Sequence, residues 1–131
     1  MMDGTAMDID ALKAALAASP DNVPLLVLLA EAHEGQFDLD EAKEHYGRAL
    51  ESDPRHGKAA VGFARILDLQ GETSQAILRM EALCQEQPDV AEAWILRANL
   101  ALKDGEPRDA RGFYEQAIEL DSKLADDALL E

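Results

Sequence analysis

The chain has 131 residues, enough for one ordinary domain, and its 12 lysine and arginine residues against 27 aspartate and glutamate residues give a net charge of −15. Such an acidic chain lacks the basic surface that binding to nucleic acid or to an anionic membrane requires, so we expect neither as a partner. Hydrophobic residues make up 47% of the chain, which is too many for a disordered acidic segment.

We expect neither an export signal nor a membrane-spanning segment in this sequence. The first ten residues, "MMDGTAMDID", are acidic and lack the apolar core of a signal peptide. The longest apolar run, "VPLLVLLA", is far shorter than the roughly 18 residues of a membrane span. The single cysteine, Cys84, cannot form an intrachain disulfide. We therefore expect a cytoplasmic protein.

Apolar residues recur at helical spacing almost throughout, and alanine is abundant, which predicts an all-α fold. In chain order, we expect helices over Asp8–Ala18, Val23–Glu34, Asp40–Glu51, Gly57–Leu69, Ser74–Glu86, Ala91–Lys103, Pro107–Leu120 and Lys123–Glu131. Asn22 can cap the second of these, while Gly71 and Gly105 can take the left-handed conformation that ends a helix. The connections are short, so neighbouring helices should be antiparallel.

A repeat of 34 residues runs through these helices. Pro20, Pro54 and Pro88 are each 34 residues apart, which is the kind of period that helical repeat arrays show. Four further sets of three residues have the same spacing of 34. Two sets consist of alanine only, and two contain larger residues: Ala30, Ala64 and Ala98; Ala42, Ala76 and Ala110; Tyr46, Met80 and Tyr114; Ala49, Leu83 and Ala117. We expect the alanines to let two helices approach closely.

The clearest copy, "AEAWILRANLALKDGEPRDARGFYEQAIELD", resembles the tetratricopeptide repeat family in Trp94, Ala98, Gly105, Ala110 and Tyr114. The resemblance implies a right-handed α-solenoid of about three helix pairs with flanking helices, forming a single domain over residues 1–131. Its parts would be an N-terminal segment and helix (1–20), three repeats (21–54, 55–88 and 89–122) and a C-terminal capping helix (123–131). A pentatricopeptide array fits less well, because its period is 35 and its groove is basic.

The first copy departs from the family at Phe37, which stands where the turn glycine is usual. We expect its leading helix to end early and its turn to be wider. Glycine also stands in mid-helix at Gly62, where it serves either close helix packing or close ligand approach, and we favour packing.

In this family the first, or leading, helix of each pair lines a concave groove. Carrying those positions over gives a candidate peptide-binding groove: Val27, Glu31, Lys58, Val61, Arg65, Asp68, Ile95, Asn99, Leu102 and Lys103. Val27, Val61 and Ile95 would form an apolar ladder in the groove, or would instead pack between helices. Arg65 and Asn99 would bind a peptide backbone or carboxylate. The carboxylate clamp of chaperone-binding relatives needs lysine and asparagine where this chain has Val27 and Glu31, which disfavours chaperone tails.

No pattern of catalytic, cofactor-binding or metal-binding residues stands out. His33, His45 and His56 lack the spacing of a zinc motif, so we interpret them as surface residues. Cys84 falls on the inner stripe of its helix and should be a buried thiol. We expect no enzyme activity and no cofactor.

The leading hypothesis is therefore a non-catalytic scaffold that binds a peptide or helix of a partner protein in its groove. Two alternatives remain open: a self-assembly module in which repeats of different chains stack, and the N-terminal regulatory or adaptor part of a larger multidomain protein.

Overall fold

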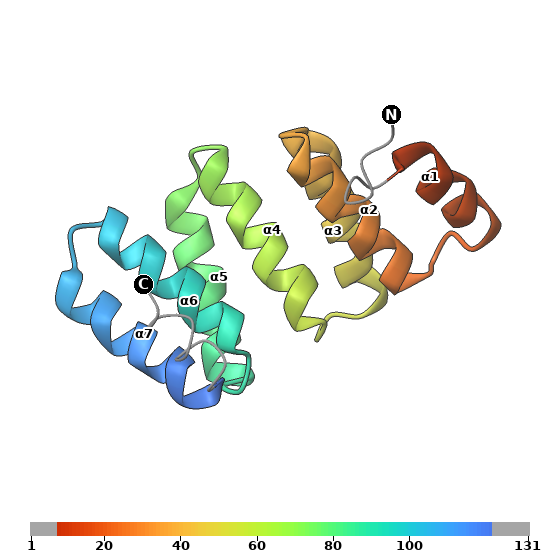
Figure 1. Ribbon diagram of the computed structural model, residues 1–131. Helices are drawn as coiled ribbons and strands as arrows, with labels where there is room; N and C mark the ends of the chain where they lie inside the picture. The colour runs from red at the N-terminus through yellow and green to blue at the C-terminus, as the bar shows by residue number, and fades with distance from the viewer. Residues whose placement is uncertain (1–7, 122–131) are drawn as a thin grey trace.

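A computed structural model describes residues 8–121, which form an array of antiparallel helices (Figure 1). The helices are α1 (Ile9–Ala18), α2 (Val23–Gly35), α3 (Leu39–Ser52), α4 (Gly57–Leu69), α5 (Thr73–Glu86), α6 (Ala91–Lys103) and α7 (Pro107–Leu120). The predicted helix over 123–131 lies outside the described residues. Among the described helices, none is long and apolar enough to cross a membrane.

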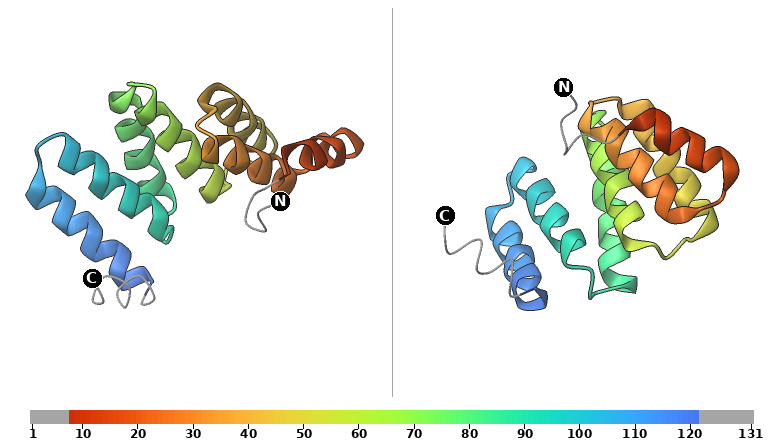
Figure 2. Two further views of the ribbon diagram at one scale, coloured as in Figure 1. Left: turned by 45° about the horizontal axis from the view of Figure 1, so that its top comes forward. Right: turned by 45° about the vertical axis from the view of Figure 1, so that its right-hand side comes forward.

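The helices form three hairpins, α2–α3, α4–α5 and α6–α7, stacked side by side with α1 packed on α2 (Figures 1 and 2). Helix α4 contacts both α2 and α6, so the leading helices form one continuous layer. This is the all-α solenoid that the sequence predicted. Asn22 begins α2 as expected, since its side chain accepts a hydrogen bond from the Leu25 amide at 3.1 Å.

The three hairpin turns share one geometry, and here the expectation for the first turn was wrong. In each turn an amide donates to the carbonyl five residues earlier, at 2.8 Å from Asp38 to His33 and from Glu72 to Leu67, and at 2.9 Å from Glu106 to Ala101. Helix α2 continues to Gly35, and Phe37 takes the left-handed conformation with φ of 59°, as Gly71 and Gly105 do at 87° and 76°. The turn is not wider, because the chain adopts the strained conformation at phenylalanine instead.

The alanines of the two repeat trios are all buried, with exposed fractions of 0 to 4%, so they are the helix contacts that the sequence predicted. Tyr46 and Met80 are also buried, at 1% each. Tyr114 differs: 43% of it is exposed, because no described helix follows α7 to cover it.

Gly62 is a point of close contact between α3 and α4. A Cβ atom at Gly62 would lie 2.3 to 2.8 Å from three ring carbons of Tyr46, well inside van der Waals contact. The glycine therefore serves packing, as the sequence analysis favoured, and the Tyr46 ring fills the space that a side chain would take.

The left-handed conformation of Phe37 predicts that Phe37→Gly stabilises the chain. A non-glycine residue there costs roughly 1–2 kcal/mol, partly offset by the greater freedom of glycine in the unfolded chain. Since 68% of Phe37 is exposed, little packing is lost. We expect a gain of about 0.5–1 kcal/mol in the free energy of unfolding by urea denaturation. Gly71→Ala should change it in the opposite direction; a lower midpoint for Phe37→Gly would contradict the argument.

Gly62→Ala should be strongly destabilising, because the added methyl group forces Tyr46 or α4 to move. Overpacking of this kind costs about 1–3 kcal/mol. Gly112→Ala is the matched control: Gly112 is also in a helix, but nothing lies within 4 Å of its added Cβ. That control should gain up to about 1 kcal/mol in thermal or urea unfolding, since alanine is the better helix former. Equal effects of the two substitutions would show that the Tyr46 contact does not constrain Gly62.

Candidate functional site

The leading-helix face, formed by α2, α4 and α6, carries ion pairs that run from each helix to the next. Lys58 of α4 lies 3.3 Å from Glu31 of α2. Arg65 of α4 pairs with Glu34 of α2, and Lys103 of α6 pairs with Asp68 of α4. The positive side chains predicted to receive a ligand therefore each have a carboxylate partner within the chain.

Glu34 is the centre of the strongest of these contacts. Arg65 donates to both of its carboxylate oxygens, with Nη2 at 3.0 Å from Oε1, and the Tyr46 hydroxyl donates to the same oxygen at 2.7 Å. Since Tyr46 belongs to α3, this one carboxylate connects α2, α3 and α4. Two donors from a fork-shaped guanidinium make the pair both strong and directional.

These contacts shift three pKa values. Burial opposes ionisation of Glu34, yet the hydrogen bonds from Arg65 and Tyr46 outweigh it and lower the pKa of Glu34 below 4.5. Burial and the bond to Glu34 raise the pKa of Tyr46. The hydrogen bond to Glu34 raises the pKa of Arg65, although burial opposes it. At neutral pH the Glu34–Arg65 pair is fully charged.

Asp68 has the corresponding role between the second and third repeats. Lys103 Nζ lies 2.8 and 2.9 Å from its two oxygens, and the Thr73 hydroxyl donates to it at 2.7 Å. Burial opposes ionisation here too, but these donors lower the pKa of Asp68. The acid at this repeat position is Glu34 in the first repeat and Asp68 in the second, but the third repeat has Leu102 there.

The predicted groove residues separate into three groups in the structure. Val27 and Val61 are buried in the core, at 5% and 2% exposed, and Ile95 is half-buried, so an exposed apolar ladder does not form. Helix packing explains the two valines, which is the other interpretation that the sequence left open. The ion-paired residues are Glu31, Lys58, Arg65, Asp68 and Lys103. Asn99 and Leu102 are exposed on α6.

Sequence reasoning missed a hollow between α6 and α7, the last pair of helices that the structure describes. It has a volume of about 360 Å³ and is lined by Ala98, Asn99, Leu102, Pro107, Ala110, Arg111 and Tyr114. Leu102 is 59% exposed and Tyr114 is 43% exposed, so the hollow gathers two large apolar side chains at the surface. The signal in the sequence was Leu102, which stands at the repeat position that Glu34 and Asp68 occupy in the first two repeats.

Two expectations about single residues had different outcomes. Cys84 is a buried free thiol, as predicted, and burial raises its pKa. The histidines were interpreted as surface residues, which is wrong for His33 and His45: they are 4% and 6% exposed. His56 is half-buried and caps α4 through its Nδ1, which accepts from the Ala59 amide at 3.1 Å.

Comparison with known families identifies the repeat. A tetratricopeptide repeat family matches residues 34–100, and a second one matches residues 91–124. The chain belongs to the tetratricopeptide repeat family. The first match alone spans half of the sequence and extends across parts of all three hairpins.

Several solved tetratricopeptide structures share the fold. One from Parabacteroides merdae has 26% identity and a TM-score of 0.71, with 88% of this chain and 46% of that chain covered. YrrB, described as a tetratricopeptide protein with an unusual peptide-binding site, has 22% identity and a TM-score of 0.71, with 94% and 64% covered. A MamA structure has 18% identity and a TM-score of 0.65, with 93% and 82% covered. No curated protein sequence matches the chain.

The lowered pKa of Glu34 predicts how the free energy of unfolding of this chain depends on pH. The folded state favours the carboxylate, so Glu34 contributes stability above its ordinary pKa of 4.5, and this contribution is lost as the pH falls through the lower folded value. Glu34→Gln should cost about 1–2 kcal/mol at pH 7, after allowing for the partial exposure of Arg65. The difference from wild type should shrink at acid pH.

Urea denaturation at several pH values checks this prediction, with Glu31→Gln as the matched control. Glu31 makes only a surface pair with Lys58, so its loss should cost about 0–1 kcal/mol. A Glu34→Gln cost that stays constant from neutral to acid pH would contradict the assignment.

Proposed function

We propose that this chain is a non-catalytic scaffold that binds an extended or helical segment of a partner protein on its leading-helix face. The observation that carries the proposal is the hollow between α6 and α7, where Leu102 and Tyr114 present apolar surface. Exposed apolar side chains gathered in one hollow typically mark an interaction site.

The ion pairs indicate which part of the face would do the binding. Lys58, Arg65 and Lys103 already have carboxylate partners, so an acidic ligand would have to compete with Glu31, Glu34 and Asp68. At the α6–α7 end the cation is Arg111, which makes only an exposed pair with Glu115 at 3.5 Å, and such a pair costs little to replace. There an apolar anchor of the partner would enter the hollow, while Asn99 and Arg111 supply donors for its backbone.

The comparison with YrrB supports this proposal in a general way. That protein shares the fold and is described as having a peptide-binding site, which makes peptide binding on a helical face a reasonable function for this chain as well. The residues proposed here come from the hollow itself.

A second candidate function is self-assembly. The hollow lies at the last described hairpin, so the N-terminal end of another copy, where α1 packs on α2, could stack against it and extend the array. Both functions would use the same apolar surface, but only self-assembly makes the molecular mass depend on the concentration of the chain alone.

Leu102→Glu should weaken binding of peptides selected on the wild-type chain from a displayed random library. Burying a leucine side chain is worth about 1.5–3 kcal/mol, so we expect a loss of affinity of tenfold or more, measured by fluorescence anisotropy. Leu78→Glu is the matched control, because Leu78 is also exposed, at 65% against 59%, but lies on α5. Equal affinities for the two variants would contradict the proposed site.

Sedimentation velocity separates the two candidate functions. A wild-type chain that stays monomeric over a wide range of concentration supports peptide binding. A wild-type oligomer that Leu102→Glu dissociates and Leu78→Glu does not would favour self-assembly.

A further inference from the structure

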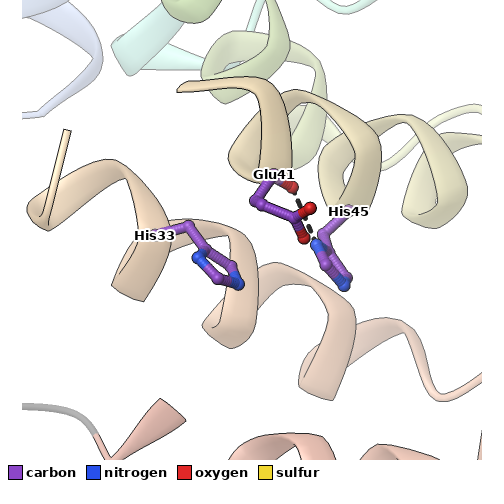
Figure 3. A group of neighbouring side chains, drawn as sticks. All are labelled: His33, Glu41 and His45. Carbon is purple, nitrogen blue, oxygen red and sulfur yellow. Dashed lines mark hydrogen bonds between the residues drawn. The ribbon is translucent and has the colours of Figure 1, made fainter. Parts of the chain in front are cut away.

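Two buried histidines and a glutamate meet between α2 and α3 (Figure 3). His33 lies in the last turn of α2, whereas Glu41 and His45 lie four residues apart on α3. Each side chain offers a ligand atom, and these atoms all lie within 4.8 Å of one another. A search for histidine pairs within one helix could not find this group, because it combines two helices.

Neither ring nitrogen of His33 has a hydrogen-bond partner among residues 8–121. Only 4% of His33 is exposed, so both nitrogens are buried. Nδ1 lies 3.3 Å from Asp38 Oδ2, but not in the geometry of a hydrogen bond. Buried polar atoms are nearly always satisfied in folded proteins, so an unpaired imidazole calls for a water molecule or an ion as its partner.

The repeat itself does not require histidine at these positions. The residues equivalent to His33 in the next two repeats are Leu67 and Ala101, and Leu67 is buried in the same turn. Those equivalent to His45 are Arg79 and Phe113. The later repeats therefore pack without histidine at either position.

The surrounding contacts leave one nitrogen of each ring available. His45 Nδ1 lies 2.7 Å from the carbonyl oxygen of Glu41, and because a carbonyl only accepts, this nitrogen carries the proton and Nε2 keeps its lone pair. Asp38 beside Nδ1 of His33 favours the same arrangement there. Histidine ligands of metals are usually held in this way, by a carbonyl or a carboxylate on the other nitrogen.

We propose that His33, His45 and Glu41 bind one divalent transition-metal ion of the Zn²⁺ class. Two imidazoles and one carboxylate suit Zn²⁺, whereas Mg²⁺ and Ca²⁺ require mainly oxygen ligands. A tetrahedral ion at about 2.0–2.1 Å from each ligand needs ligand atoms about 3.4 Å apart, so the side chains would draw inward by about 1 Å.

Solvent reaches the group from two sides. One hollow, of about 460 Å³, is lined in part by Glu41 and His45, and another, of about 510 Å³, is lined in part by His33 and Asp38. A water molecule from either side can complete the coordination, and the bound ion links α2 to α3 at the N-terminal end of the stack. This proposal is independent of peptide binding.

Zn²⁺ alone is the probe. The full chain, freed of metal by a chelator, is titrated at pH 7 by calorimetry, and its unfolding temperature is followed with and without the ion. We expect one ion per chain at micromolar concentrations and a rise in unfolding temperature, since binding to the folded state stabilises it. An excess of Mg²⁺ should not compete.

Four variants test the assignment, with circular dichroism to check folding. Asp38→Asn should weaken binding by about 10- to 100-fold, as the loss of an outer partner does, and His33→Leu and Glu41→Gln should each weaken it at least as much. Glu41→Gln changes an accessible side chain, so it tests the site even if His33→Leu misfolds. His56→Asn keeps a capping residue and should bind like wild type.

The proposal is overturned if the wild-type chain takes up no Zn²⁺ at one-to-one stoichiometry, or if Mg²⁺ displaces it. It is also overturned if Glu41→Gln and a folded His33→Leu bind as wild type does, because binding would then come from surface carboxylates.

Discussion

The contact between the Tyr46 ring and the backbone of Gly62 sets the distance between the first two hairpins, and much of the structure depends on it. Because Gly62 has no side chain, the ring lies directly against α4. The same position carries the Tyr46 hydroxyl to Glu34, whose carboxylate also receives Arg65 from the turn after Gly62. One missing side chain thus permits both an apolar contact and a three-helix polar network, in a fold where each hairpin can bury its apolar face only against its neighbours.

The leading-helix face changes in character along the stack. Between α2, α4 and α6 it is polar, and its charges neutralise one another across the helix boundaries. In the third repeat, Leu102 stands at the position that Glu34 and Asp68 occupy in the first two repeats. Leu102 lines the hollow between α6 and α7. Pairs that already satisfy each other hold the scaffold together, and a ligand gains little by replacing them. Recognition is therefore better placed at the apolar end.

The first hairpin differs from the later hairpins in the side chains that lie between its two helices, α2 and α3. Where later repeats use apolar residues or arginine, it buries two stacked imidazole rings, 5.4 Å apart between centroids, next to a glutamate. A terminal hairpin has a neighbouring hairpin on one side only, and among the described helices α1 covers the other side. An ion between α2 and α3 would link the two helices of this terminal hairpin.

The sequence by itself determined the helices, the turns at Gly71 and Gly105, and the alanine contacts, because each follows from local propensity or from the 34-residue period. The tertiary structure alone decided features that join residues far apart in the chain. Phe37 adopts the left-handed conformation that Gly71 and Gly105 adopt in the other two turns. Val27 and Val61 are buried in the core, and the Glu34 carboxylate of α2 receives both Arg65 of α4 and Tyr46 of α3. His33 meets His45 only across two helices, since helical periodicity says which residues share a face but not which faces of different helices meet.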